Sequence, residues 1–278
     1  MLLAPLNTYY TEDRIFIGIL AFFVLVPGLG PRLGIPGFGR GGGLMSYSKF
    51  AHAADTVTSS CVVRSRLGMT MMYAPAALLA FATWGYVNDH DPASHDFRAH
   101  HVAVLVMLHF LKRTVECLFL HKYSGTMPMM SSAFVGAFYC VSVLIMVFFA
   151  YFSDQHAVEL GLSQDPLVQH VGFALFAAGE LGNLYHHYLL ANLRKPGETA
   201  YKVPAGGLFE FVAAPHYLCE IVAWMGIACI MQHLAGWLVV ACITFYLTER
   251  AVAQSKWNRS KLGSKYPRSR GHILPFLF

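Results

Sequence analysis

Seven apolar stretches constrain this chain more than any other feature of its sequence. They cover approximately residues 15–30, 68–87, 101–120, 131–152, 167–193, 208–231 and 234–250. A helix needs roughly 20 apolar residues to cross a bilayer. Hydrophobic residues make up 56% of the chain and charged residues only 13%, which excludes an ordinary cytosolic enzyme and a secreted disulfide scaffold. We therefore expect an all-α polytopic membrane protein, built as a seven-transmembrane helix bundle.

Basic residues gather in alternate connections between these stretches. Sixteen of the 20 lysines and arginines lie in residues 31–67, 121–130, 194–207 and the tail from 250. Only two lie in the other connections, which are rich in Asp and Glu. Because basic connections stay on the cytosolic side of a membrane, we predict a multi-pass protein with a cytosolic C-terminus and an odd number of spans.

The third stretch carries ionisable side chains that a membrane makes costly. His109, Lys112, Arg113 and Glu116 are spaced by three or four residues and therefore share one helix face. Ionisable residues inside a span indicate a functional site, and this group could bind a phosphate or polarise a carbonyl. Alternatively, Lys112 and Arg113 form a cationic helix end that reaches the membrane surface.

The fifth stretch has a second polar face, which contains Glu180, Asn183, His187 and Arg194. Such a face could bind the ribose and phosphates of a cofactor, or it could be a hydrogen-bonded network between helices. We expect no metal site, because no H-E-x-x-H pattern occurs and the adjacent His186 and His187 point about 100° apart on a helix.

The sixth stretch contains Tyr217, with His216 and Glu220 close to it on the helix. A tyrosine in an apolar site can donate a hydrogen bond to a carbonyl and later give up its proton. A buried tyrosine can equally be structural. Upstream, Arg194 and Lys195 could hold an anionic cofactor at the membrane surface or serve as an ordinary cytosolic anchor.

A glycine pattern at residues 37–42 does not indicate a Rossmann fold. It fits G-x-G-x-x-G, but that fingerprint needs a strand before it and a helix after it. Neither can be read from the sequence here, so any nucleotide would have to bind elsewhere.

Several motifs recur in the order found in one known family. Residues 192–198 (NLRKPGE), 201–204 (YKVP), 206–210 (GGLFE) and 273–278 (ILPFLF) closely resemble the steroid 5α-reductase family. Residues 109–128 are even more similar to its sister branch, the very-long-chain enoyl-CoA reductases, and residues 45–50 resemble the plant-type branch. We therefore divide the chain into an N-terminal region of membrane spans and a cytosolic loop (1–100) and a C-terminal catalytic domain (101–278).

The resemblance implies an enzyme of the endoplasmic reticulum membrane that binds NADPH from the cytosolic side, within the bundle. Its reaction would be the reduction of a carbon–carbon double bond conjugated to a carbonyl. In enzyme classification this is an oxidoreductase that acts on CH–CH groups with NADP as acceptor. Its partners would be membrane lipids and a lipid substrate, either a steroid or a long-chain enoyl-CoA, and no nucleic acid.

The resemblance also implies site residues. The family's cofactor contacts match Arg113, Asn183, Arg194, Tyr201, Glu220 and Arg250, together with His187 and His216, where the steroid enzymes carry Asp and Asn. The enoyl-CoA branch implies catalytic roles for Lys112, Arg113 and Tyr217.

The residues expected to hold the substrate differ from those of the steroid enzymes. Tyr73 and Phe110 stand where those enzymes hold the ketone with a Glu and a Tyr, so that pair is absent. Tyr73 is then a second candidate acid beside Tyr217, and a water is a third. The sequence leaves open which enone is reduced.

Two other functions compete with this one. A membrane methyltransferase that acts on a lipid or a prenylated cysteine would bind S-adenosylmethionine in place of NADPH. A channel, transporter or scaffold would need a continuous polar path across the spans, whereas the polar faces here cluster toward the cytosolic half.

Overall fold

The computed structural model describes residues 61–90, 98–159, 165–195, 197–198 and 200–275. The apolar stretch at 15–30, the glycine pattern at 37–42 and the motif at 45–50 lie outside the described residues. Within the described part, the chain is mostly helical, in agreement with the expected class, and has one two-stranded sheet.

Six long helices make up the described bundle. They are α2 (Ser65–His90), α3 (Arg98–Val115), α4 (Met129–Glu159), α5 (Pro166–Ala191), α6 (Pro215–Met231) and α7 (Leu234–Leu262). The short elements are the antiparallel strands β1 (Val62–Arg64) and β2 (Thr126–Pro128), the π-helix η3 (Glu116–Leu120) and the 3-10 helices η4 (Gly207–Glu210) and η5 (Gly263–Lys265).

Every apolar stretch after residue 60 forms a helix, but several of the predicted ends were wrong. The fourth stretch was expected to end at residue 152, whereas α4 continues to Glu159. The sixth stretch was expected from residue 208, whereas α6 begins at Pro215, because proline suits the first helical position. The seventh was expected to end at residue 250, whereas α7 continues to Leu262 and stops before Gly263, which has φ +55°. Hydropathy measures the length of the apolar segment, and a helix can continue past it into polar sequence.

Three of these helices are long and apolar enough to cross a membrane. They cover Ser65–His90, Met129–Asp154 and Leu234–Lys265, and Pro215–Met231 is a shorter apolar helix. This result supports a membrane protein. The count of seven spans and the cytosolic position of the C-terminus stay predictions.

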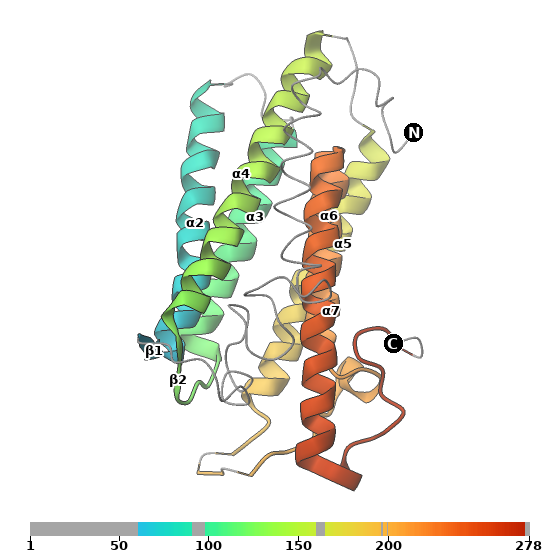
Figure 1. The fold of residues 1–278 in the computed structure, drawn as a ribbon. Helices are drawn as coiled ribbons and strands as arrows, with labels where there is room; N and C mark the ends of the chain where they lie inside the picture. Colours follow the sequence, from blue (N-terminus) through green and yellow to red (C-terminus); the bar gives the residue numbers. More distant parts are fainter. Residues whose placement is uncertain (1–60, 91–97, 160–164, 196, 199, 276–278) are drawn as a thin grey trace, which may run out of the picture.

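The helices pack as two groups. α2, α3 and α4 contact one another, α6 contacts both α5 and α7, and the groups meet where α3 packs on α6 and α4 on α7. The sheet, the connection after α5 and the C-terminal segment all lie at the lower end of the bundle in Figure 1. We call this the basic end, because its connections carry Lys122, Arg194, Lys195, Lys202, Lys265, Arg268 and Arg270.

Glycines bring α5 and α6 unusually close together. A Cβ atom at Gly172 would lie 2.8 Å from the carbonyl oxygen of Gly226, and one at Gly179 would overlap the backbone of Ala223. Small residues allow such close packing between helices in membranes. The tight pairing fixes the end of α5 against the start of α6, and both line the cavity described below.

We expect Gly179→Ala to destabilise the protein by about 1–3 kcal/mol, because the added methyl group meets backbone that cannot move aside. The measurement is thermal unfolding of the purified protein in detergent. Gly85→Ala is the matched control: Gly85 also lies in a helix, and a Cβ there meets nothing within 4 Å among the described residues. Equal melting of both variants would show that the α5–α6 contact tolerates a methyl group.

Candidate active site

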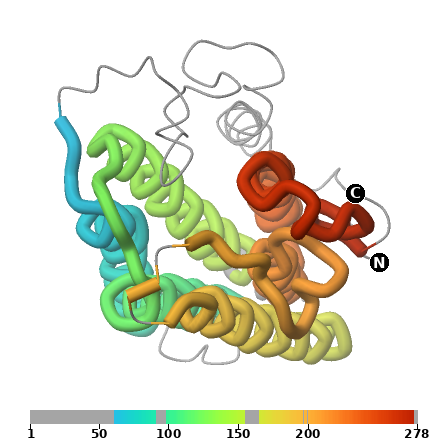
Figure 2. The backbone as a smooth tube through the Cα atoms, turned by 90° about the horizontal axis from the view of Figure 1, so that it is seen from below, coloured from blue at the N-terminus to red at the C-terminus, as the bar shows by residue number. Residues whose placement is uncertain are grey.

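A cavity of about 520 Å³ opens at the basic end, between the two groups of helices. Figure 2 views the molecule from this end, with the connection after α5 and the C-terminal segment on the side of α5–α7. Residues 121–127 form part of the opposite wall, together with the start of α2. The wall therefore combines segments that are far apart in the sequence.

The side chain of Arg113, at the end of α3, organises the buried part of the cavity wall. Its Nη1 donates to Oε2 of Glu116 at 2.8 Å and lies 2.9 Å from Nδ1 of His187, and its Nη2 donates to the Tyr73 hydroxyl at 2.9 Å. All four residues are buried. Because a guanidinium stays charged and offers donors in a fixed plane, these contacts hold α2, α3 and α5 in one arrangement.

Glu116 reaches Arg113 from the first position of the π-helix η3, which continues α3 directly. π-Helical turns are rare and occur frequently at functional sites. This turn is followed by His121, whose ring lines the cavity at 4.7 Å from the ring of His187. Burial, and then the nearby Arg113 cation, lower the pKa of His121 to about 4, so it is neutral at physiological pH.

Lys112 does not line the cavity. Its Nζ lies 3.7 Å from Oε1 of Glu116, but its shorter contacts are with other residues. Its Nζ donates to Oδ1 of Asn183 at 2.6 Å and pairs with Glu180 at 2.8 Å, and Glu180 also contacts Nδ1 of His109 at 2.6 Å. Nδ2 of Asn183 donates to the backbone oxygen of His216 at 2.8 Å. The predicted site residues Lys112 and Asn183 therefore contact groups of the protein, and they tie α3 and α5 to the first turn of α6.

The structure brings the other predicted site residues together around the cavity. Those that line it are Tyr73, Arg113, His187, Arg194, Tyr201, His216, Tyr217, Glu220 and Arg250. Phe110, by contrast, is buried in the core against Tyr139 and Trp224.

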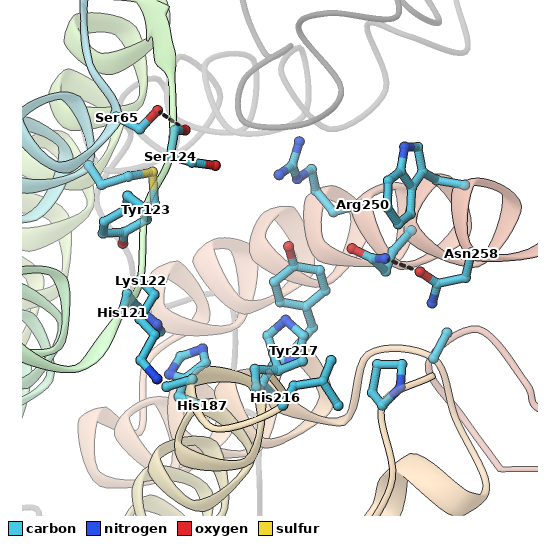
Figure 3. A pocket seen from close by; sticks show the side chains of 18 of the residues that line it. Ser65, His121, Lys122, Tyr123, Ser124, His187, His216, Tyr217, Arg250 and Asn258 are labelled. Atoms are coloured by element: carbon cyan, nitrogen blue, oxygen red, sulfur yellow. Dashed lines mark hydrogen bonds between the residues drawn. The ribbon is translucent and has the colours of Figure 1, made fainter. Parts of the chain in front are cut away.

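Aromatic rings cover much of the inner wall. The ring centroids of His187 and His216 lie 5.2 Å apart, and those of His216 and Tyr217 lie 4.2 Å apart. Figure 3 shows Tyr217 extending from α6 into the cavity. Tyr73 stacks on Tyr139 on the other side, with centroids 5.4 Å apart.

The polar extension of α7 adds residues that the sequence analysis missed. Gln254, Trp257 and Asn258 line the cavity, and the Trp257 ring lies 4.7 Å from that of Tyr201. The signal that could have found them is the run of helix-compatible residues between Arg250 and Gly263. His121 and Lys122 were missed as well, because no pattern in the sequence shows where the segment after η3 turns.

The chemistry of the lining suits an anionic ligand with polar edges. Arg113, Lys122, Arg194, Lys202 and Arg250 all line the cavity, and Glu220 is its one acidic residue among those described. The buried nitrogen atoms that have no hydrogen-bond partner among the described residues include Nε of Arg113, Nδ1 of His216 and Nδ2 of Asn258, all in residues that line the cavity. Buried polar atoms normally have partners, so these atoms would be satisfied if a bound polar ligand supplied the missing hydrogen bonds.

One cluster has the composition of a metal site. Donor atoms of Glu116, His121 and His187 lie within 4.8 Å of one another. However, the permanently charged Arg113 contacts both Glu116 and His187, and it would repel a metal cation at this short range. We therefore interpret the cluster as one that keeps the Arg113 side chain in position, and not as a metal site.

Comparison with known proteins identifies the family. The family model described as 3-oxo-5-alpha-steroid 4-dehydrogenase matches residues 125–278. The chain belongs to this family. The matched region contains the α5–α7 side of the cavity, whereas Tyr73, Lys112 and Arg113 precede it.

The similar proteins include an enoyl-CoA reductase and steroid 4-dehydrogenases. A very-long-chain enoyl-CoA reductase of Dictyostelium discoideum is 35% identical over 63% of this chain. 3-oxo-5-alpha-steroid 4-dehydrogenase 1 of Rattus norvegicus is 33% identical over 62%, and that of Macaca fascicularis is 31% identical over 72%. The matches span 56%, 65% and 74% of these relatives, respectively.

We expect Glu116→Gln to lower the free energy of unfolding by about 3 kcal/mol, because it removes the countercharge of a buried arginine. Thermal unfolding in detergent measures this loss. Glu198→Gln is the matched control, since Glu198 is exposed and pairs with Lys202 at the surface, where such pairs contribute little. Equal unfolding midpoints would mean that Glu116 does not compensate the charge of Arg113.

Proposed function

We propose that the protein is an NADPH-dependent membrane oxidoreductase that reduces a carbon–carbon double bond conjugated to a carbonyl in a lipid. The observation that carries the proposal is the cavity at the basic end, where arginines and several tyrosines, among them Tyr73 and Tyr217, line one space. The names of the relatives, an enoyl-CoA reductase and 3-oxo-5-alpha-steroid 4-dehydrogenases, support the same chemistry.

The α5–α7 side of the cavity suits the nucleotide. Arg194, Lys202 and Arg250 supply positive charge for the phosphates, and arginine favours phosphate because it can donate two parallel hydrogen bonds. The rings of Tyr201 and Trp257 provide an aromatic surface, with the Arg194 guanidinium 6.0 Å from the Tyr201 ring. His216 and Glu220 line the cavity deeper in the bundle.

When bound, NADPH supplies the hydride that reduces the β carbon of the enone. The task of the protein is then to stabilise the negative charge that develops on the carbonyl oxygen and to provide a proton for the α carbon. Tyr217 is our candidate acid, because its ring extends into the cavity. Arg113 also lines the cavity and donates to Tyr73, which strengthens the Tyr73 hydroxyl as a donor to the same oxygen. Electrostatic stabilisation is strongest where water is excluded.

We also propose that the basic end faces the cytosol at the endoplasmic reticulum membrane. Its connections hold most of the basic residues of the chain, and such connections remain cytosolic. This orientation opens the cavity toward NADPH in the cytosol and places the rest of the bundle among membrane lipids.

We expect Arg194→Ala to weaken NADPH binding at least about tenfold, because charge-assisted hydrogen bonds to a phosphate are lost. Fluorescence titration of the purified protein with NADPH measures the affinity. Arg259→Ala is the control, because Arg259 is an exposed arginine of α7 outside the cavity. Unchanged affinity in a folded Arg194→Ala variant would remove this assignment, and binding of S-adenosylmethionine in place of NADPH would favour a methyltransferase.

We expect Tyr217→Phe to lower kcat by about 100-fold, the scale of general acid catalysis, with little change in KM or in NADPH affinity. The assay follows NADPH oxidation with a 3-oxo-4-ene steroid and with a long-chain trans-2-enoyl-CoA. Tyr73→Phe is measured in parallel. A near-normal rate in Tyr217→Phe combined with a loss in Tyr73→Phe would transfer the acid role to Tyr73.

A further inference from the structure

Glu180 is a mostly buried carboxylate that the proposed reaction does not use. It lies on α5 and does not line the cavity. Its side chain is only 12% exposed. A charged side chain inside a membrane protein is costly unless partners compensate its charge, so its contacts indicate what it does.

Two side chains of α3 hold the two oxygens of this carboxylate. Nδ1 of His109 lies 2.6 Å from Oε1, and Nζ of Lys112 lies 2.8 Å from Oε2. His109 is itself fixed, because it is buried and its ring centroid lies 4.9 Å from that of Trp224. Glu180 therefore presents a negative charge to Lys112 at a fixed place.

Lys112 has two carboxylates within reach, and Glu180 is the nearer one. Its Nζ lies 3.7 Å from Oε1 of Glu116, which also pairs with Arg113 at 2.8 Å. Because the attraction between unlike charges falls with distance, the shorter contact with Glu180 keeps Lys112 beside α5. Without the charge of Glu180, Lys112 would be drawn toward Glu116.

The position of Lys112 decides the orientation of the Asn183 side chain. An ammonium group can only donate hydrogen bonds, so the amide oxygen of Asn183 must face it. Oδ1 of Asn183 accepts from Nζ of Lys112 at 2.6 Å. The Nδ2 group then faces α6, where it donates to the backbone oxygen of His216 at 2.8 Å. Lys112 thus fixes which group of the amide reaches α6.

The first turn of α6 gains support from this bond. Ala214, the residue before the helix, has no side chain that can cap it, and the helix begins with Pro215. Tyr217 follows His216 directly, and its ring extends from this turn into the cavity (Figure 3). The bond from Asn183 therefore helps to set where the Tyr217 hydroxyl lies.

We infer that Glu180 is a positioning residue for Tyr217, which acts through Lys112 and Asn183. The inference rests on the proposed function, in which Tyr217 donates the proton, and it adds a residue that does not touch the reactants. It also gives Lys112 the role of orienting Asn183 in place of a direct catalytic role. A misplacement of about 1 Å at a reacting group can lower the rate by about 100-fold.

Glu180→Gln tests the inference, because the amide keeps the shape of the side chain and removes its charge. The assay follows NADPH oxidation by the full-length protein with the 3-oxo-4-ene steroid or the long-chain trans-2-enoyl-CoA that it reduces. We expect kcat to fall at least about tenfold. The KM for the enone and the affinity for NADPH should stay unchanged, because Glu180 lies outside the cavity. Asp89→Asn is the matched control, since Asp89 is an exposed carboxylate in the last turn of α2.

The double variant Glu180→Gln/Tyr217→Phe separates positioning from other roles. The effects of residues that act as a unit are not additive, so Glu180→Gln should lower kcat by less than about twofold when residue 217 is already Phe. The same loss in both backgrounds would overturn the inference, as would a near-normal kcat in a folded Glu180→Gln variant. A near-normal rate in Tyr217→Phe alone would also overturn it and would leave the proposed reductase function intact. Reduction of no enone by the unmodified protein would contradict the proposed function, and the inference with it.

A second variant applies if Glu180→Gln does not fold. Lys112→Met/Glu180→Gln removes both charges of the pair, a change that buried ion pairs often tolerate, and the glutamine can still contact His109. Asn183 then has no cation to orient it, so kcat should fall by about the same factor, again with unchanged NADPH affinity. An unchanged kcat in this folded variant would overturn the inference.

Discussion

The buried guanidinium of Arg113 is the interaction on which the rest of the site depends. It contacts Tyr73 on α2, Glu116 on η3 and His187 on α5. A buried cation is strongly destabilising when its countercharge is missing, so the cavity wall forms only when these elements meet. The same contacts fix the Tyr73 hydroxyl and the His187 ring in the wall of the cavity.

Lys112 and Arg113 are adjacent residues of α3 and have different roles. Lys112 joins Glu180 and Asn183, and through Asn183 it positions the backbone of His216 beside Tyr217. Arg113 faces the cavity. Consecutive helical residues point about 100° apart, which places one cation in the packing between helices and the other in the site. The resemblance to enoyl-CoA reductases treated these residues as one pair. In the structure both pair with Glu116, but their other partners differ.

Much of the fold could be predicted because hydropathy and length identify apolar helices without any knowledge of their neighbours. The ends of those helices were less predictable. α7 continues through polar residues and brings Trp257 and Asn258 to the cavity, and α3 changes to a π-helix at Glu116. Both features depend on contacts with distant segments. The β1–β2 pair that presents Arg64 joins residues about 60 positions apart and has no local signal.

The sequence by itself determined the class of the molecule, the gathering of basic residues in alternate connections and the supply of Arg, His and Tyr for the site. These properties follow from composition and order alone. Only the tertiary structure decided which polar residues share one cavity and which are used in packing. Such decisions depend on distances of a few ångströms between different helices, and helix register, the π-helical turn and the close approach at Gly179 set those distances.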